Sequence, residues 1–316
     1  MKAKTKPRIT LLAGGVGAAR LLRGLARVVE PERLTVVVNT ADDDRFYGLH
    51  VSPDLDTIVY TLAGLAPVHP GWGLSGESFA CLGALERYYG GSWFALGDRD
   101  LATHVFRTDR LAAGGSLSDV TREICRAHDV AQRVLPMTDA AVRTVVETPA
   151  GTLAFQDYLV RRRARPRVTA VRFRGIRGAH PAPGVLEALE EADAIVLGPS
   201  NPFVSIAPIL ALPGVRRVLR RRRDRVLAVA PLVGGRAVKG PLASMLRSLG
   251  HRRGVAGIAD YYRRLVGTLF VHPGDRPRRS EAGWPEFVER DIMIARPAAA
   301  ARLARALVGR IRTEEN

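Results

Sequence analysis

The segment at residues 9–22 constrains the possible folds of this chain more than any other. Its sequence, ITLLAGGVGAARLL, joins a short apolar run to a glycine cluster and then to an amphipathic stretch. This order predicts a buried strand, a tight turn and a helix. Glycines let a ligand approach the backbone closely, and the free amide groups at a helix N-terminus favour a phosphate.

The glycine spacing by itself leaves two interpretations open. Gly14, Gly15 and Gly17 form the pattern Gly-Gly-x-Gly. This pattern is neither the full dinucleotide-binding fingerprint nor the lysine-bearing phosphate loop. The segment is therefore either a nucleotide phosphate site or a simple tight turn between a strand and a helix.

The rest of the chain alternates between apolar runs and amphipathic stretches, which predicts an α/β fold with a doubly wound, mostly parallel sheet. We expect a single domain over residues 1–316, with a largely helical insertion at 54–130. After the first strand, further strands are expected at 34–40, 133–137, 142–147, 152–160, 168–173, 194–198, 225–230, 268–271 and 291–295, with a strand-like run at 93–95. After the first helix, further helices are expected at 54–66, 74–89, 98–111, 116–127, 183–191, 206–212, 242–249 and 297–312.

Composition narrows the class of protein. The 316 residues are 47% hydrophobic, and no apolar run reaches the ~18 residues of a membrane-spanning helix. The basic N-terminus is followed by an apolar run that breaks at the glycines, so we do not expect a signal peptide. The two cysteines fit no metal-ligand pattern and no disulfide framework. We therefore expect a cytoplasmic protein without a membrane partner.

The formal net charge of +17 also allows two interpretations. One is a nucleic-acid surface, and the other is an arginine-rich composition combined with an anionic substrate. The arginine runs, at 161–167, 216–223 and 278–279, lie between apolar runs and have little aromatic interleaving. We therefore expect no nucleic-acid partner.

A group of carboxylates follows the second expected strand. Asp42, Asp43 and Asp44 follow shortly after Asn39, and Asp54 and Asp56 begin the next expected helix. They are either a solvated loop with a helix cap or a Mg²⁺ site. Carboxylate oxygens suit Mg²⁺, and the carboxyl ends of parallel strands are where α/β sheets bind ligands.

Two later motifs also combine polar groups with tight turns. Asp98 and Arg99 begin a helix that carries His104, which has no Ser or Cys partner nearby and is expected to be structural. The second motif follows an expected buried strand and is either a turn with a cap or part of a pocket shared with the glycine cluster. Its candidate ligand-binding residues are Gly198, Ser200, Asn201 and Ser205.

Taken together, these segments resemble the 2-phospho-L-lactate transferase family of coenzyme F420 biosynthesis. The order and spacing of the motifs match to about residue 296. The motifs that carry the resemblance are AGGVGAAR (13–20), VNTADD (38–43), SPDLDT (52–57), GWG (71–73), LGDRDLATH (96–104), LPMTD (135–139), FQDY (155–158) and GPSNP (198–202). Ser52 stands where relatives carry cysteine.

The resemblance implies a Rossmann-like fold, a homodimer and a specific reaction. A phosphorylated three-carbon acid, delivered as a guanosine diphosphate ester by an upstream guanylyltransferase, is transferred to the deazaflavin Fo, and GMP leaves. It also implies Mg²⁺ as cofactor, with Asp42 and Asp54 as its ligands. The implied catalytic residues are Asp42, Asp54, Asp56 and Arg99, and the implied substrate-binding residues are Gly14, Gly15, Gly17, Asn39, Asp98, Gly198, Ser200, Asn201 and Ser205.

Several points stay open at the level of sequence. Relatives use 2-phospholactate, phosphoenolpyruvate or 3-phosphoglycerate, and no motif distinguishes these acids. An aspartate of the cluster is expected to accept the proton of the attacking hydroxyl, but the sequence does not say which one. The alternative function is a nucleotide-binding oxidoreductase, and a third is a nucleic-acid binder without enzymatic activity.

Overall fold

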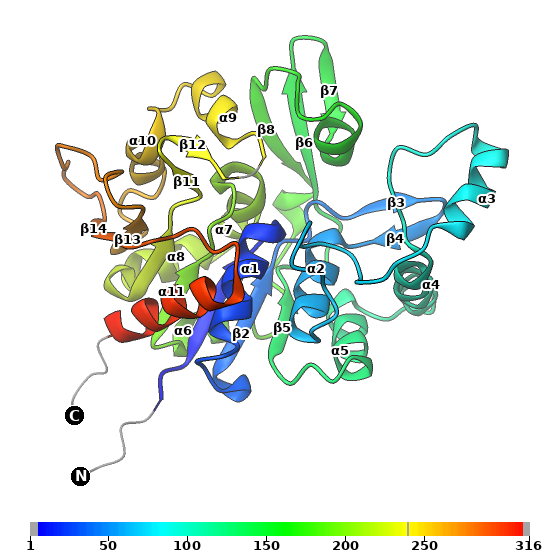
Figure 1. The fold of residues 1–316 in the computed structure, drawn as a ribbon, viewed down its shortest axis with the longest axis horizontal. Coiled ribbons are helices and arrows are strands. Elements are labelled where there is room, and N and C mark those ends of the chain that lie inside the picture. The colour runs from blue at the N-terminus through cyan, green and yellow to red at the C-terminus, as the bar shows by residue number, and fades with distance from the viewer. Residues whose placement is uncertain (1–5, 239, 312–316) are drawn as a thin grey trace.

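One parallel sheet of seven strands forms the centre of the molecule (Figure 1). The computed structural model describes residues 6–238 and 240–311. All neighbouring strands of this sheet run parallel, so the predicted α/β doubly wound fold is confirmed. In spatial order the strands are β14 (Glu286–Glu289), β13 (Thr268–Val271), β10 (Val226–Val229), β9 (Ala194–Leu197), β1 (Ile9–Ala13), β2 (Leu34–Val38) and β5 (Arg133–Pro136).

The strand order reverses direction between β1 and β9. From β1 the chain moves outward to β2 and β5, and it later returns to place β9, β10, β13 and β14 on the other side. In open parallel sheets, ligands bind in the crevice outside the carboxyl ends of the strands where the order reverses. The loops that follow β1, β2 and β9 therefore lie at the edge of the sheet where this rule predicts a ligand.

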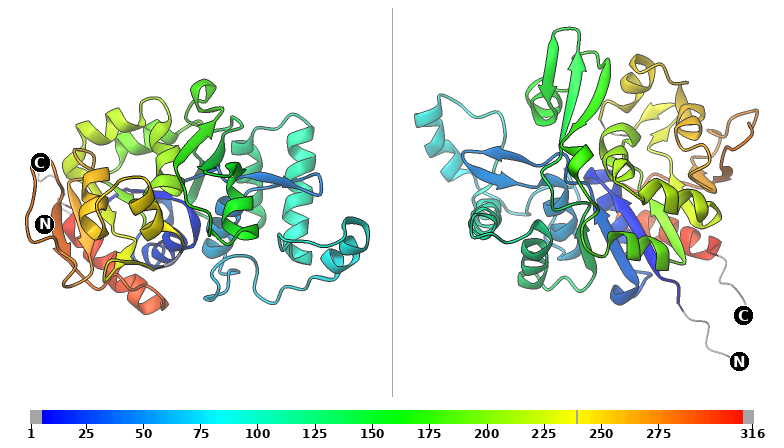
Figure 2. Two further views of the ribbon diagram at one scale, coloured as in Figure 1. Left: turned by 90° about the horizontal axis from the view of Figure 1, so that it is seen from above. Right: turned by 180° about the vertical axis from the view of Figure 1, so that it is seen from behind.

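Helices cover both faces of the sheet. Figure 1 shows α1, α2 and α11 on the front face, and the view from behind in Figure 2 shows α6 and α8 on the opposite face. Gly24 lets α1 and α11 pack closely, because a Cβ there would lie 2.3 Å from the Ala300 carbonyl oxygen. In chain order the α-helices of the described residues are α1 (Gly15–Leu25), α2 (Pro53–Leu62), α3 (Ala80–Tyr89), α4 (Asp98–Ala112), α5 (Leu117–Ala127), α6 (Val185–Glu191), α7 (Ala207–Ala211), α8 (Val215–Arg221), α9 (Leu242–Ser248), α10 (Gly254–Tyr261) and α11 (Pro297–Arg310).

The segment between β2 and β5 contains α2 to α5 and projects from one side of the sheet (Figure 1). Helix α3 begins at Ala80, so the expected helical start at 74 is wrong. Gly76 has φ +68° in that stretch, a conformation that a helix does not contain. No strand forms at 93–95. The sequence also did not predict the hairpin of β3 (Asp44–Phe46) and β4 (Leu49–Val51).

A small antiparallel sheet stands apart from the main sheet. It consists of β6 (Arg143–Thr148), β7 (Gly151–Ala154) and β8 (Ala170–Arg174), with β6 in the middle. The strand expected at 152–160 ends at Ala154, because Phe155 and Tyr158 turn into the core through the helical turn Asp157–Arg161. The strand expected at 168–173 exists as β8, but it pairs with β6 rather than joining the parallel sheet.

The C-terminal part differs from expectation at the edge of the main sheet. No strand forms at 291–295, because β14 already pairs with the free edge of β13. Ile292 and Ile294 are nevertheless buried. The final helix ends at Arg310, and the expected end at 312 lies outside the described residues. A short hairpin joins β11 (Leu232–Val233) to β12 (Arg236–Ala237).

Among the described residues, no single helix is both long and apolar enough to cross a bilayer. One bent pair of helices, 202–211 with 215–221, passes this test by length and composition alone.

Candidate active site at the carboxyl edge of the sheet

Asp54 links the first turn of α2 to the glycine loop. Its Oδ1 accepts a hydrogen bond from the Gly15 backbone N–H at 2.8 Å, and its Oδ2 accepts one from the Asn39 side-chain amide at 3.0 Å. Gly15 has φ +68°, which turns its N–H toward this carboxylate. The first amide of α1, expected to be free for a phosphate, therefore contacts Asp54.

Asp42 lies in the loop that follows β2 and is almost completely buried. The Gln156 side chain donates to the Asp42 backbone carbonyl at 3.1 Å, and the Asn39 Oδ1 accepts from the Ala41 N–H at 3.0 Å. These two bonds fix the backbone of the loop. The Asp42 Oδ1, by contrast, has no hydrogen-bond partner among the described residues.

Burial makes both of these carboxyl groups hard to ionise. It raises the pKa of Asp54 to about 6, although Asn39 and the Gly15 N–H favour the charged form. Burial, followed by the charge of nearby Asp54, raises the pKa of Asp42 well above its usual range. The side chains of Thr144 and Asn39 act in the opposite direction on Asp42. Two acidic groups thus share a desolvated position without a counter-charge.

The Asp42–Asp54 pair fits a hard divalent cation. Mg²⁺ prefers oxygen ligands and is usually held by one or two carboxylates together with substrate phosphates. The orphaned Asp42 Oδ1 is a buried acceptor of this kind. Within residues 6–238 and 240–311, no Lys, Arg or His side chain forms an ion pair with Asp42 or Asp54. The residues present therefore suit the predicted cofactor.

A second carboxylate cluster joins the first turn of α2, which also carries Asp56, to α4. Asp56 forms a two-pronged ion pair with Arg107 of α4, in which the Arg107 Nη1 lies 3.2 Å from the Asp56 Oδ2. Both side chains are buried. Burial raises the pKa of Asp56, while Arg107 and His104 limit that rise by favouring the carboxylate. This acid has the counter-charge that Asp42 and Asp54 lack.

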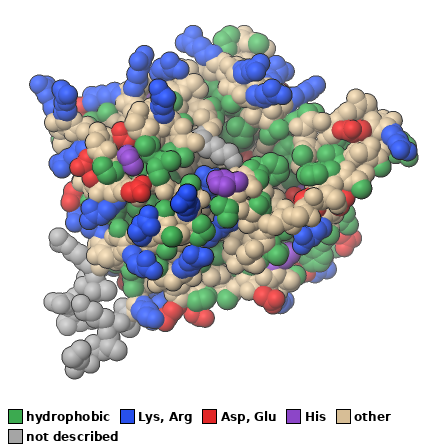
Figure 3. Space-filling model, in the orientation of Figure 1, with side chains coloured by type: hydrophobic (Ala, Val, Ile, Leu, Met, Phe, Trp, Pro, Cys, Tyr) green, Lys and Arg blue, Asp and Glu red, His purple; other side chains and the backbone are tan. Residues whose placement is uncertain are grey.

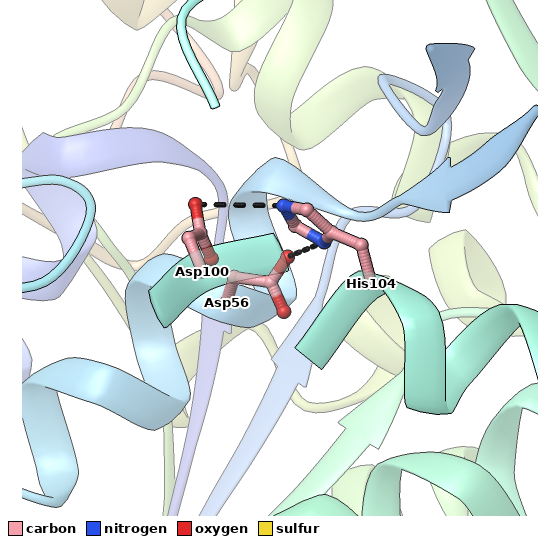
Figure 4. Close-up of side chains that lie close together, drawn as sticks. All are labelled: Asp56, Asp100 and His104. Carbon is pink, nitrogen blue, oxygen red and sulfur yellow. Dashed lines mark ion pairs between the residues drawn. The ribbon is translucent and has the colours of Figure 1, made fainter. Parts of the chain in front are cut away.

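His104 lies between two carboxylates of this second cluster (Figure 4). Its Nδ1 is 3.7 Å from the Asp56 Oδ2, and its Nε2 is 3.4 Å from the Asp100 Oδ2. Tyr60 donates to the Asp100 Oδ1 at 2.7 Å, which completes the contacts of that carboxyl group. The expected structural role of His104 agrees with this placement.

These three residues are close enough to be considered as metal ligands, but their arrangement argues against it. The two carboxylates lie at different ring nitrogens, Asp56 at Nδ1 and Asp100 at Nε2, whereas a neutral imidazole offers the lone pair of only one nitrogen to an ion. Arg107 also already neutralises Asp56. We therefore interpret the Asp56–His104–Asp100 group as an ion-pair network.

The loop after β9 packs directly against the glycine loop. The Ser200 hydroxyl donates to the Gly14 carbonyl at 2.7 Å. A Cβ on Gly14 would lie 2.7 Å from the Ser205 Cβ, and one on Gly17 would lie 2.1 Å from the Pro199 carbonyl oxygen. The two predicted loops therefore share one edge, as expected, and the missing side chains at Gly14 and Gly17 allow this packing.

Asn201 and Gly198 hold the same loop in shape. The Asn201 Oδ1 accepts from the Phe203 N–H at 2.9 Å and caps the helical turn Pro202–Ile206. Its side-chain amide lies 3.3 Å from the Met245 sulfur. Gly198 faces α1, where an added Cβ would approach the Ala18 Cβ to 2.8 Å. In these contacts both residues act as parts of the turn.

Asp98 and Arg99 lie at the junction of α3 and α4. The Asp98 carboxylate accepts from the Ala80 and Cys81 backbone N–H groups, each at 2.9 Å, and so caps α3. Arg99 donates to the Ser75 carbonyl at 2.9 Å. In the described residues neither side chain contacts Asp42 or Asp54.

Several contacts at the site were not predicted from the sequence. Arg107 was not singled out, although it follows Asp100 and His104 on one face of α4. Asp43 accepts from the Ser52 hydroxyl at 2.7 Å and lies 3.2 Å from the His50 Nε2, which fixes the β3–β4 hairpin beside α2. Gln156 contacts the Asp42 loop from the small sheet.

The fold and the site define a class of α/β protein. At the point where the strand order of its parallel sheet reverses, it carries a glycine loop and buried carboxylates. The model of the family described as 2-phospho-L-lactate transferase CofD matches residues 9–283. The chain therefore belongs to the CofD family of transferases, and the predicted family is confirmed.

Individual relatives agree with this assignment. The chain is 44% identical over 260 residues to the phosphoenolpyruvate transferase of Streptomyces griseus, which covers 81% of this chain and 82% of that one. It is 40% identical over 265 residues to the 2-phospho-L-lactate transferase of Methanococcoides burtonii, covering 84% and 86%. A crystal structure of a Bacillus halodurans protein, 18% identical, has a TM-score of 0.60 over 96% of this chain and all of that chain, which supports the fold.

Proposed function

We propose that this protein transfers a phosphorylated three-carbon acid from a guanosine diphosphate ester to the deazaflavin Fo, with Mg²⁺ as cofactor. The acceptor hydroxyl of Fo attacks the phosphorus nearest the acid. A new O–P bond forms, the bond to the GMP oxygen breaks, and GMP leaves. The product is the precursor of coenzyme F420, and membership of the CofD family supports this choice of reaction.

The observation that carries the proposal is the Asp42–Asp54 pair. The two acids are buried at the carboxyl edge of the sheet and lack a cationic partner among the described residues, and Asp54 contacts the glycine loop. Bound there, Mg²⁺ would neutralise charge that develops on the phosphates. Asn39 and the Gly15 N–H orient Asp54 for this purpose, and Gln156 fixes the backbone at Asp42.

The same contacts narrow the choice of proton acceptor. Asp56 is engaged by Arg107 and His104, so its carboxylate is less available to a hydroxyl. Asp42 and Asp54 are not engaged by a cationic side chain, so proton acceptance falls to a carboxylate oxygen of this pair that the cation would leave free. Arg99 is engaged at the α3–α4 junction and remains only a candidate for contact with substrate.

The acid substrate is best identified by direct assay. The named relatives transfer phosphoenolpyruvate or 2-phospho-L-lactate, so both acids are candidates, and 3-phosphoglycerate is the third. Purified protein is mixed with Fo, GTP, Mg²⁺, a guanylyltransferase and each acid in turn, and the deazaflavin product is weighed by mass spectrometry. We expect one acid to give a Mg²⁺-dependent product with loss of GMP. A lack of any Fo adduct with all three acids would refute the proposal.

Two binding controls separate the alternatives. A dinucleotide-dependent oxidoreductase needs an acidic residue at the end of the second strand to hold a ribose. Here β2 is followed by Asn39, whose amide donates to Asp54. We expect saturable binding of GDP, no saturable binding of NADH, and no salt-dependent retention of duplex DNA. The homodimer and the cytoplasmic location stay predictions of the family resemblance.

A further inference from the structure

Arginine side chains occur in runs along this chain, and two of these runs are used in different ways. In the run at 216–223, Arg221 forms an ion pair with Glu190 of α6. Arg222 donates hydrogen bonds to the backbone carbonyl groups at the end of the same helix. These two guanidinium groups therefore link the end of α8 to α6 and are already occupied within the fold.

The run that follows Asp157 has far fewer partners. Arg161 and Arg162 both approach this carboxylate, with the Arg161 Nη1 3.7 Å from its Oδ1 and the Arg162 Nε 2.9 Å from its Oδ2. Within the described residues, the side chains of Arg163 and Arg165 form no hydrogen bond or ion pair. Four neighbouring positive charges thus share one carboxylate, and they repel one another.

An open cavity of about 620 Å³ lies among these side chains. We call it the arginine pocket, and its lining residues are Arg161, Arg162, Arg163, Arg165 and Pro166. The run lies between β7 and β8, and in Figure 3 basic side chains gather at the top of the molecule, in the part where Figure 1 shows the small sheet. The volume is in the range of small-molecule sites, about 300–1,000 Å³, but those sites are mostly apolar. A cationic lining of this kind suits an anion.

The turn that carries the arginine pocket is fixed against the core. The Ala164 N–H donates to the carbonyl of the buried Tyr158 at 2.8 Å, and the Arg162 N–H donates to the Asp157 carbonyl at 2.9 Å. Arg163 and Ala164 both have φ +52°, a conformation that residues with a Cβ retain only where the surroundings hold it. The backbone of the pocket is therefore in place before a ligand arrives, which lowers the cost of binding.

We propose that the arginine pocket binds a small anion with several linked phosphate groups, either a free oligophosphate or the phosphate chain of a nucleotide. Guanidinium groups bind phosphate oxygens in pairs, through two parallel N–H···O bonds. The bound phosphates would supply the negative charge that Asp157 alone does not provide for four arginines. A single phosphate would fill only part of the cavity, so linked phosphates fit it better. This inference does not depend on the proposed activity.

The size of the pocket favours a small anion over a nucleic acid. A protein that binds duplex DNA contacts about 6–10 phosphates along an extended surface. The arginine pocket is formed by one turn, and the arginines at the end of α8 are engaged by α6. Among the described residues, its lining contains no aromatic side chain of the kind that stacks on the bases of single strands.

Calorimetry with inorganic tripolyphosphate tests the proposal at about 0.15 M salt, where a Debye length of about 8 Å screens distant charges. EDTA is included, so that the candidate active site holds no cation and its acids repel the probe. We expect one tripolyphosphate per chain of the wild type. In Arg163→Gln/Arg165→Gln the dissociation constant should be at least ~10-fold higher, because two charge-assisted contacts are lost.

The matched control is Arg278→Gln/Arg279→Gln. It removes the same charge from another exposed part of the chain and is expected to keep the wild-type affinity. An equal loss of affinity in the two double variants would overturn the proposal, because it would reduce the effect to net charge. A wild-type protein that does not bind tripolyphosphate would overturn it as well.

Folding and the source of the phosphates are checked with the same proteins. Arg163 and Arg165 are exposed, so their double variant is expected to keep the wild-type melting temperature, and Arg165→Gln alone gives a second variant with a smaller loss of affinity. ATP binding as tight as that of tripolyphosphate would support the nucleotide source, and weaker ATP binding would support a free oligophosphate. Duplex DNA that binds at this salt concentration, displaces tripolyphosphate and is lost in the double variant would overturn the proposal in favour of a nucleic-acid surface.

Discussion

The Asp42–Asp54 pair and the Asp56–Asp100 pair lie close together, but only the second pair has cationic partners among the described residues. Asp56 and Asp100 have Arg107, His104 and Tyr60 as partners within the chain. Asp42 and Asp54 have only uncharged donors, and one oxygen of Asp42 has no partner among the described residues. The two pairs of acids therefore differ in where their compensating charge comes from: the partners of Asp56 and Asp100 lie within the chain, whereas Asp42 and Asp54 have no cationic partner in the described residues.

This difference separates a structural network from a binding site. A buried charge is stable when it is paired and hydrogen-bonded, and it is costly otherwise. Asp56 is paired with Arg107 of the same chain, and this ion pair links α2 to α4. The Asp42–Asp54 pair does not, which is expected of a site whose counter-charge arrives with a ligand. The following predictions are arranged from the largest expected effect to the smallest.

Removing the buried positive charge of Arg107 should lower the stability of the fold more than any other change considered. Arg107→Met leaves Asp56 as a buried, unpaired carboxylate, and breaking a buried ion pair in this way costs about 3–5 kcal/mol. Urea unfolding at pH 7 measures the loss. The matched control is Arg110→Met on the same helix, which breaks the solvent-exposed ion pair with Glu123 and should cost much less stability. Equal costs in the two variants would contradict the structural role of Arg107.

The pH dependence of stability should reveal the uncompensated charge at Asp54. Its folded-state pKa of about 6 lies above the ordinary value of 3.8, so the folded protein holds this proton more tightly than the unfolded chain. In metal-free protein this contribution is present below about pH 4 and is lost as the pH rises to about 6, by up to about 3 kcal/mol.

Asp54→Asn removes this titration. The free energy of unfolding of the wild type should therefore fall relative to the variant between pH 4 and pH 6, a window set by the raised pKa, and the difference should then level off. Urea titrations of both proteins in EDTA at several pH values provide the measurement. A difference that grows with pH in favour of the wild type would show that Asp54 is stabilised as a carboxylate.

A substitution at Asp42, whose counter-charge would come with a ligand, should reduce activity rather than stability. Asp42→Asn is expected to lower turnover ~100-fold, or about 2.7 kcal/mol of activation free energy, because the substitution would remove an ionic ligand of the proposed Mg²⁺ site. Stability should barely change, since the substitution relieves repulsion with Asp54. Asp44→Asn, at the start of β3 directly after that loop and only half-buried, is the control and should keep its activity. Near-normal turnover of Asp42→Asn at limiting Mg²⁺ would remove Asp42 from the metal site.

The features that can be predicted from the sequence are those whose residues lie close together along the chain. The strand, glycine turn and helix at 9–22 were predicted because the signal is local, and the order of later motifs placed the Gly198 loop at the same edge. The Asp56–Arg107 pair was missed because it joins residues 51 positions apart on two helices. No local spacing encodes that contact, and it forms only after α4 has packed beside α2.

The edge of the main sheet shows the same limit. Residues 286–289 and 291–295 both have strand-like composition, yet only one segment can pair with β13. The choice depends on register and on where the chain returns, which periodicity does not report. Asp98 is a related case among the candidate site residues. It was expected near the substrate because of its family motif, whereas the contacts of its carboxylate are with the backbone of α3.

The smallest effect is expected at Gly15, the glycine whose N–H contacts Asp54. Gly15 has φ +68°, and an added Cβ would meet only the Asp54 Oδ1, at 3.9 Å. Gly15→Ala therefore introduces backbone strain without a clash, at about 1–2 kcal/mol of stability. Gly64 is a matched control, because its φ is +73° and a Cβ there would meet nothing within 4 Å. The two variants should lose equal stability in urea unfolding.

Ligand binding should separate these two variants. In Gly15→Ala the strain falls on the N–H that orients Asp54, so the affinity for GDP with Mg²⁺ should weaken several-fold in calorimetry. In Gly64→Ala the strain lies at the end of α2, away from the glycine loop, and affinity should not change. Unchanged affinity in both variants would mean that the turn at Gly15 only connects β1 to α1. In that case the metal and nucleotide site would depend on Asp42 and the Gly198 loop without help from the glycine turn.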